Sequence, residues 1–440
     1  MTYDTTIGLS GEELRGRAAR LIPGGCHTYA KGDDQFPAIA PPFIVRGSGS
    51  HVWSCDGREY IEYGMGLRAV TLGHAFPPIL EAAIRELAKG SNFTRPSPVE
   101  VECAECLLEM VPGAEMVKFC KDGSHAVDGA IRLARAFTGR DLIAVCGDHP
   151  FFSTSDWFIG TTEMSAGIPD ATKRLVLKFR YNDIDDLEAL FALHPKQIAC
   201  VIMEAARTEE PHEGYLAEVR KLADRYGAVL VFDEMITGFR WHNGGAQGVY
   251  KVTPDLSTFG KALANGFSVS ALCGRRELMK LGGSQHDRER VFLLSTTHGA
   301  EAHELAAALA TMKYYQAHPV VGTLYERGAR LRAGFVEAVC EFGLYGHVEV
   351  VGRDCNLLFV TRDAEGRPSQ ALRALFMQEL VRHGVLAPSF VVSYSHSEDD
   401  IDKTVDAVRA ALRVYGRALE DGVEKYLVGR PVMPVFRRHG

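Results

Sequence analysis

Two residues with complementary chemistry follow buried-strand patterns in the middle of the chain. Asp233 ends the apolar run AVLVFDE, and Lys261 follows Gly260 in the segment PDLSTFGKALANG. A lysine amine can attack a carbonyl carbon and move protons, and a carboxylate can hold a proton on a ring nitrogen. Taken singly each residue is weak evidence, since most lysines are solvated and an aspartate after a strand often caps a helix.

A candidate anion site lies upstream, in VKFCKDGSHAVDGAIRLARA. Here a strand pattern runs into a short turn at Gly123 and Ser124 and then into a helix pattern. Backbone N–H groups at a helix N-terminus, together with a hydroxyl, favour a bound phosphate. The alternative is that Ser124 is a plain helix cap.

A lysine, a carboxylate for a ring nitrogen and a phosphate turn are the groups that pyridoxal 5′-phosphate (PLP) requires. Asp233 lies at the carboxyl end of its strand, the edge at which open α/β sheets bind ligands. Glycines on both sides of Lys261 let the backbone approach a cofactor closely. The sequence thus offers each group that PLP needs, with Lys261 and Asp233 as the candidate catalytic residues.

The segment VLVFDEMITGFRWHNGGAQGVYKVTPDLSTFGKALANG closely resembles the DE-x-x-TGFR, GGAQ and PDL-x-x-x-GK motifs of the class-III aminotransferases. LIPGG, WSCDGREYIEY, TLGH and HSEDDID extend the resemblance over nearly the whole chain, and within the family the glutamate-1-semialdehyde aminomutases are nearest. The resemblance implies fold type I, with a large, mostly parallel, seven-stranded α/β domain and a small α+β C-terminal domain. It also implies homodimers in which both subunits contribute to each active site.

The resemblance assigns further cofactor contacts. Thr296, in LLSTTHGAEA, corresponds to a threonine that contacts the phosphate of the cofactor bound by the partner subunit. The neighbouring Thr297 is the alternative for this position. Phe151, in GDHPFFSTSD, is favoured over Phe152 for stacking on the ring, and an ordinary core phenylalanine is the alternative. Met235 is expected on the opposite ring face, provided that the strand continues beyond Asp233.

Two more positions near the cofactor come from the same resemblance. Glu204 closes the strand pattern IACVIME and corresponds to a glutamate near the cofactor or the substrate. Gly123 and Ser124 match the family's phosphate turn, but Asp122 places an anion where the family has a serine or a similar residue.

Three positions depart from the aminomutase pattern. An arginine after the Pro-Gly-Gly loop is replaced by Lys31, which offers a point charge in place of a bidentate carboxylate ligand. A tryptophan before Leu-Gly-His becomes Leu67, and residues 388–390 contain no acid where the aminomutase has a glutamate. These losses argue against glutamate-1-semialdehyde as the substrate.

Lys31, Arg68 and Arg207 are the candidate substrate-binding residues. Ammonium and guanidinium groups bind phosphate and carboxylate. If at least two of these three side chains point into the site, we expect an anionic carbonyl substrate, such as a phosphorylated or nucleotide-linked one. The alternative is that they are solvated or ion-paired on the surface.

Alternating helix and strand patterns must position these residues. From about Pro77 the apolar runs LVLKF, IACVIME, AVLVFDE and VSALC alternate with helix-period segments. Apolar runs without internal alternation indicate strands buried on both faces, and hence a mostly parallel sheet between helices. We expect an N-terminal arm with a small hairpin packing with the small domain (1–75), a large PLP-binding domain (76–317) and a small C-terminal domain (318–440).

Composition excludes several other classes of protein. The 440 residues are 46% hydrophobic and carry a net charge of −7, which argues against nucleic-acid or anionic-membrane partners. No segment approaches the roughly 20 apolar residues that span a bilayer, and the N-terminus lacks a secretory pattern, so we expect a cytoplasmic protein. The ten cysteines lack the paired spacing of a zinc site, and we expect no metal.

Three hypotheses for function follow. The first is a PLP-dependent aminotransferase that moves an amino group from an amino-acid donor to a carbonyl substrate in a biosynthetic pathway. The second is an aminomutase of the glutamate-1-semialdehyde type, which the missing carboxylate-binding arginine disfavours. The third is a catalytically silent α/β binding protein. The joint retention of Lys261, Asp233 and the phosphate turn argues against it.

Overall fold

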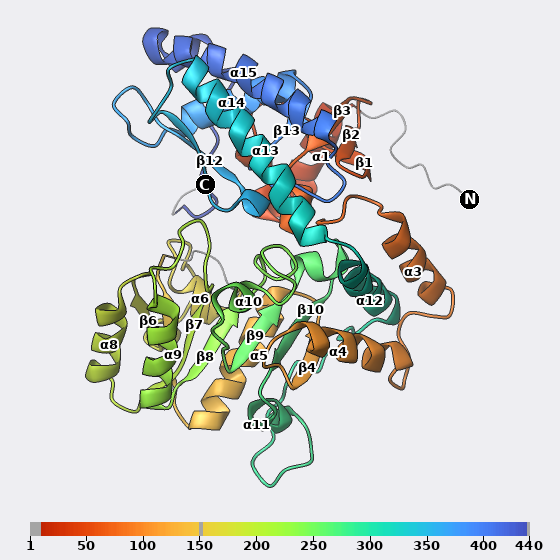
Figure 1. Cartoon of the computed structure of the whole chain (residues 1–440), viewed down its shortest axis with the longest axis vertical. Coiled ribbons are helices and arrows are strands. Elements are labelled where there is room, and N and C mark those ends of the chain that lie inside the picture. Colours follow the sequence, from red (N-terminus) through yellow and green to blue (C-terminus); the bar gives the residue numbers. More distant parts are fainter. Residues whose placement is uncertain (1–9, 149–152, 438–440) are drawn as a thin grey trace. The chain divides into compact units, whose positions relative to one another are not determined.

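The structure, a computed structural model, describes residues 10–148 and 153–437 (Figure 1). The described chain divides into two compact units. We call residues 68–70 and 77–321 the large unit, and residues 10–67, 71–76 and 322–437 the small unit. Among the described residues, no helix combines the length and the apolar character needed to cross a membrane.

A seven-stranded sheet forms the centre of the large unit. Its strands are β4 (Met116–Cys120), β5 (Leu142–Cys146), β6 (Val176–Phe179), β7 (Ile198–Met203), β8 (Val229–Asp233), β9 (Leu256–Phe259) and β10 (Ser270–Gly274). The spatial order is β4-β10-β9-β8-β7-β5-β6, and β10 runs antiparallel to both of its neighbours while the other pairs are parallel. The mostly parallel α/β fold predicted from the apolar runs is confirmed.

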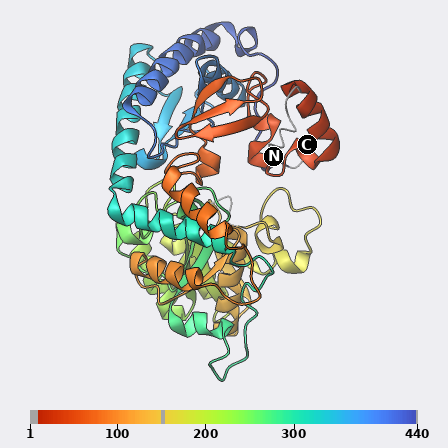
Figure 2. The ribbon, with the colours of Figure 1, turned by 90° about the vertical axis from the view of Figure 1, so that its right-hand side faces the viewer.

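Helices cover both faces of this sheet. The helices of the large unit are α3 (Pro77–Leu87), α4 (Pro98–Met110), α5 (Gly123–Thr138), α6 (Asp156–Ile159), α7 (Asp170–Lys173), α8 (Ile184–Leu193), α9 (Tyr215–Tyr226), α10 (Ala246–Tyr250), α11 (Arg276–Met279) and α12 (Ala302–Ala317), of which α5 and α11 lie against one face of the sheet and α8 and α9 against the other. Figure 2 shows α3 and α4, in orange, packed beside α12, in teal.

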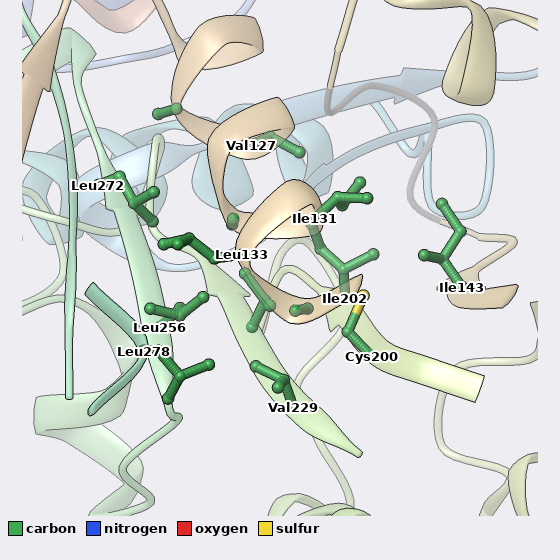
Figure 3. Packing of buried hydrophobic residues seen from close by; sticks show 14 of the residues in the cluster. Val127, Ile131, Leu133, Ile143, Cys200, Ile202, Val229, Leu256, Leu272 and Leu278 are labelled. Carbon is green, nitrogen blue, oxygen red and sulfur yellow. The ribbon is translucent and has the colours of Figure 1, made fainter. Parts of the chain in front are cut away.

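Side chains along the central strands alternate between two buried clusters. In β7, Cys200 and Ile202 belong to the cluster that contains α5, whereas Val201 and Met203 belong to the cluster on the opposite face. Figure 3 shows side chains of α5, including Ile131, turned toward the strands. Because both faces are buried, these strands read in the sequence as continuous apolar runs.

The register of the sheet places Asp233 and Lys261 at the ends of two neighbouring strands. β8 and β9 are parallel neighbours, and Asp233, the last residue of β8, pairs in register with Thr258. β9 ends one residue later, at Phe259, and Lys261 follows after Gly260. The carboxyl ends of two adjacent strands therefore deliver the predicted carboxylate and the predicted lysine.

The small unit contains two further sheets. β1 (Ile44–Ser48), β2 (His51–Ser54), β3 (Glu59–Glu62) and β13 (Val385–Leu386) pair in that order, and β11 (Val348–Val351) pairs with β12 (Leu358–Thr361). Its helices are α1 (Gly11–Leu21), α14 (Gln370–Arg382) and α15 (Glu398–Asp421), together with α13 (Val320–Glu341), whose first two residues lie in the large unit. The expected N-terminal hairpin corresponds to β1 and β2, which are antiparallel.

The start of β9 depends on a buried carboxylate. Asp255 accepts hydrogen bonds from the Leu230 amide (2.8 Å), from Arg220 Nη1 (2.9 Å) and from Arg275 Nη1 (2.7 Å). We predict that Asp255→Ala lowers the free energy of unfolding by about 2 kcal/mol, because it leaves a buried amide and two guanidinium groups without their acceptor. Urea denaturation followed by circular dichroism measures this change.

The control for this prediction is Glu277→Ala, which removes an exposed partner of the same Arg275. An exposed ion pair contributes less than about 1 kcal/mol, so the control should unfold close to the wild type. Equal midpoints for Asp255→Ala and the wild type would contradict the assignment.

Candidate active site

Asp233 is a buried carboxylate at the end of β8. Only 2% of the residue is exposed, and its Oδ1 accepts hydrogen bonds from the Met235 amide (2.9 Å) and from Thr258 Oγ1 (3.2 Å). Burial raises the pKa of Asp233 to about 6, although the Lys261 charge and these two hydrogen bonds act in the opposite direction. A carboxylate in this position favours a cation beside it, such as a protonated ring nitrogen.

Lys261 begins a 3-10 turn directly after Gly260 and has a left-handed backbone, with φ of +42°. Burial lowers the pKa of its amine, while the carboxylates of Asp233 and Glu204 raise it. A lowered pKa increases the share of neutral amine, the form that attacks carbonyl carbons and accepts protons. A Cβ on Gly260 would lie 2.5 Å from Ser270 Oγ and 2.6 Å from Met235 Sδ, so a larger residue there would displace these two side chains.

Glu204 follows β7 immediately and is 5% exposed. Its Oε2 lies 3.7 Å from Nε of Arg207, which is a loose ion pair. Burial raises the pKa of Glu204 to about 7, and Asp233 adds to the rise, whereas Arg207, Lys261 and Arg68 oppose it. The carboxyl group of Glu204 therefore titrates close to neutral pH.

Arg68 lies at the end of α2 (Met65–Arg68), a turn whose residues all have positive φ. Its carbonyl oxygen accepts a hydrogen bond from Nη2 of Arg240 at 2.8 Å, and Arg240 is fully buried. Burial lowers the pKa of Arg68 to about 10, and the charges of Arg240 and Arg207 add to this effect. The structure thus brings Arg68 into the electrostatic neighbourhood of Lys261, and Arg207 into that of Glu204 and Arg68.

Arg240 was not assigned a role from the sequence. It belongs to the TGFR segment, and the available signal was an arginine inside an otherwise apolar and glycine-rich stretch. Its contact with Arg68 joins residues that are 172 positions apart, so no local pattern could have found the partner.

The phosphate turn differs in one respect from the sequence analysis. α5 begins at Gly123, and the cap is Asp122, whose Oδ1 accepts the His125 amide at 3.0 Å. The alternative of Ser124 as the helix cap is therefore wrong, and capping accounts for an aspartate at this position. Ser124 lies within the first turn of the helix, where its Oγ accepts a hydrogen bond from the Thr154 amide at 3.0 Å.

Met235 is placed by a turn and not by a strand. β8 ends at Asp233, so the expectation that strand geometry continues to Met235 is wrong. Instead, the Met235 amide bonds back to the Asp233 side chain, which reverses the chain locally. Its Sδ lies 2.9 Å from the position of a Cβ on Gly123 and 2.6 Å from that of one on Gly260. Met235 therefore fills the space between the phosphate turn and the lysine segment.

Phe151, Thr296 and Lys31 are the remaining predicted positions. Phe151 and its alternative Phe152 lie outside the described residues. Thr296 is exposed in the segment before α12, where its carbonyl accepts the Gly299 amide at 3.3 Å. Lys31 is exposed in the small unit, at the end of the 3-10 turn Tyr29–Lys31.

The chemistry of the remaining residues fits PLP. The large unit carries an amine of lowered pKa at Lys261, a buried carboxylate at Asp233, and a hydroxyl at a helix N-terminus at Ser124. Lys261 would bind the aldehyde carbon, Asp233 would hold the ring nitrogen, and Ser124 with the α5 amides would hold the phosphate. Within the described residues, no cluster of three or more His, Cys, Asp or Glu side chains is arranged for a metal ion.

Residues 28–412 match the model of the aminotransferase class-III family. The chain is 34% identical over 427 residues to a glutamate-1-semialdehyde 2,1-aminomutase of Syntrophomonas wolfei subsp. wolfei, covering 91% of this chain and 97% of the relative. It is 32% identical over 405 residues to a 3-aminobutyryl-CoA aminotransferase of Cloacimonas acidaminovorans, covering 90% of this chain and 94% of the relative.

Solved structures are similar over the same length. The FumI protein of Sphingopyxis sp. MTA144, in a PLP form, gives a TM-score of 0.86 at 29% identity, over 93% of this chain and 97% of that chain. An omega-transaminase from Sphaerobacter thermophilus gives a TM-score of 0.83 at 28% identity, over 93% of this chain and 98% of that chain. The predicted cofactor and fold type are confirmed. This chain belongs to the class-III aminotransferases, which are PLP-dependent enzymes of fold type I.

Proposed function

We propose that this enzyme moves an amino group from an amino-acid donor to an anionic carbonyl substrate, phosphorylated or nucleotide-linked, in a biosynthetic pathway. The observation that carries the proposal is the cluster of Arg68 and Arg207 around Glu204, in the electrostatic neighbourhood of Lys261. Arginines in this setting bind carboxylate and phosphate groups.

The charges near Lys261 support an anionic substrate. Arg68, Arg207 and Arg240 bring three positive charges, and Glu204 and Asp233 bring carboxyl groups. Guanidinium groups in such a setting bind the phosphate or carboxylate group of an anionic substrate. The name of one relative, 3-aminobutyryl-CoA aminotransferase, also supports a nucleotide-linked substrate, because coenzyme A contains a nucleotide.

Lys261 and Asp233 divide the chemical work in this proposal. When bound, PLP supplies the electron-withdrawing ring that stabilises negative charge at the substrate carbon bearing nitrogen. Nζ of Lys261 takes the proton from that carbon, a step favoured by its lowered pKa. Asp233 keeps the proton on the ring nitrogen, and the Met235 amide and Thr258 hydroxyl hold its carboxylate in position.

An aminomutase is the second candidate, because relatives of that name match the full length of the chain. A mutase transfers the amino group within one molecule and releases no keto acid, whereas an aminotransferase releases one from its donor. The loss of the arginine replaced by Lys31 and of the tryptophan replaced by Leu67 favours the aminotransferase. A silent binding protein is not consistent with membership of this enzyme family.

We further propose a homodimer with shared active sites, working in the cytoplasm. The exposure of Thr296 in one chain supports the shared site, because a threonine that contacts a partner's cofactor must be accessible before assembly.

Replacing Lys261 tests the cofactor chemistry. We predict that the wild type with PLP has a visible absorption band that bleaches with an amino-acid donor as a keto acid is released. Lys261→Ala should lack this band, since no other assigned group forms the bond, and Lys251→Ala, which changes an exposed lysine, should keep it. Bleaching of the wild-type band without keto acid release would favour the mutase.

Replacing the arginines tests the anionic substrate. We expect Arg68→Ala and Arg207→Ala to lower kcat/KM for a phosphorylated aldehyde about tenfold or more, because each loses a charge-assisted contact. A neutral aldehyde of similar size should be affected much less. Arg225→Ala, which removes an exposed arginine paired with Glu188, is the control. Equal losses for both aldehydes would contradict the proposed role.

The pH dependence of substrate binding tests Glu204. Its raised pKa of about 7 means that the carboxyl is neutral below that pH and leaves Arg207 for the substrate. Above it, the carboxylate competes for Arg207 and repels an anion. We therefore predict that KM for an anionic carbonyl substrate rises severalfold between about pH 6 and pH 8. In Glu204→Gln the rise should disappear, and a rise of the same size in that variant would show that another group titrates.

A further inference from the structure

Asp128 is a carboxylate that the proposed chemistry does not use. It lies on α5 and accepts hydrogen bonds from three side chains of the segment that follows β5. Trp157 Nε1 donates to Oδ1 at 2.7 Å, Ser153 Oγ donates to Oδ1 at 3.1 Å, and Ser155 Oγ donates to Oδ2. One side chain thus gathers three donors that are close together in the chain.

This cluster, Asp128 with residues 153–157, extends to the phosphate turn. Ser124 and Asp128 are four residues apart on α5 and therefore share one face of the helix. The Ser155 amide donates to Ser153 Oγ at 3.0 Å, and the Thr154 amide between them donates to Ser124 Oγ at 3.0 Å. Residues 153–157 therefore run along the face that carries both Ser124 and Asp128.

The bond from Thr154 leaves Ser124 suited to an anion. A serine hydroxyl has one hydrogen to donate and two lone pairs to accept with. Because the Thr154 amide occupies a lone pair, the hydroxyl hydrogen remains for another acceptor, such as a phosphate oxygen. The amide also fixes the position of Oγ, which a freely rotating serine would not do.

Burial makes the cluster sensitive to loss of its acceptor. Ser153 is fully buried and Trp157 is 7% exposed, so water cannot readily replace the carboxylate as their acceptor. Removing Asp128 would leave these donors unsatisfied, and the segment would shift to solvate them. The Thr154 amide would move with it.

We propose that Asp128 is a positioning residue for the cofactor phosphate. It holds residues 153–157 against α5, so that the Thr154 amide orients the Ser124 hydroxyl toward the phosphate. This inference rests on the proposed role of Ser124 in the PLP site.

The test is the dissociation constant of PLP, measured by titrating the apoenzyme and following the quenching of tryptophan fluorescence. Asp128→Ala should bind PLP about tenfold more weakly than the wild type. Asp128→Asn keeps one acceptor oxygen and should lie between the two. Should Asp128→Ala fail to fold, Asp128→Asn decides the question, and an unchanged constant in that variant overturns the proposal.

A double-mutant cycle separates positioning from a general loss of structure. If Asp128 acts through Ser124, Asp128→Ala should weaken PLP binding less in a Ser124→Ala background than in the wild type. Effects that simply multiply would show that the two residues act independently, and the proposal would fail.

Asp183→Ala is the matched control, because Asp183 caps another helix of the large unit by accepting the Asp186 amide at 3.0 Å. It should lose helix stability and leave the PLP constant unchanged; an equal weakening in this variant would reduce Asp128 to a structural role. If the wild type itself binds no PLP, the proposed function fails as well. If the wild type binds PLP and Asp128→Ala binds it equally tightly, only this inference fails.

Discussion

The burial of the Asp233 carboxylate is the constraint on which the rest of the site depends. An ionised carboxyl group out of water is stable only with hydrogen bonds and a nearby positive charge. The parallel pairing of β8 and β9 places the Thr258 hydroxyl where it donates one hydrogen bond to Asp233, and the turn at Met235 supplies a second hydrogen bond from its amide. Lys261, which the same pair of strands delivers, lowers the pKa of Asp233 when its amine is protonated, and a protonated ring nitrogen would supply the positive charge once PLP is bound. The sheet therefore places the lysine and the carboxylate close enough for each to shift the pKa of the other.

In the proposed function, this arrangement links catalysis to substrate recognition. Glu204 raises the pKa of Lys261 and is itself affected by Asp233, Arg68 and Arg207. A residue of this cluster that bound the substrate would thus also change the protonation of the Lys261 amine. A change of one charge in such a site therefore also shifts the pKa values of the remaining groups.

Much of this could be predicted from the sequence because the signals are local. Continuous apolar runs identify the buried parallel strands, and the order of strand, turn and helix identifies the Gly123 region. Asp233 and Lys261 stand directly after strands, so their edge of the sheet follows from topology. The assumption that the strand continues to Met235 was wrong, because a hydrogen bond from the Met235 amide to the Asp233 side chain forms a turn there, which apolar periodicity does not report.

What could not be predicted depends on contacts between distant segments. Asp128 looks like one more polar residue on a helix, and only the fold shows that residues 153–157 lie along that helix. Likewise, the position of Arg240 near the site becomes apparent only from its hydrogen bond to the Arg68 carbonyl. In both cases a buried or partly buried charged group holds another segment of the chain, through its side chains for Asp128 and through a backbone carbonyl for Arg240, near a residue assigned to cofactor or substrate. Such groups determine how accurately the reacting atoms are placed, and they become visible only once tertiary structure defines their partners.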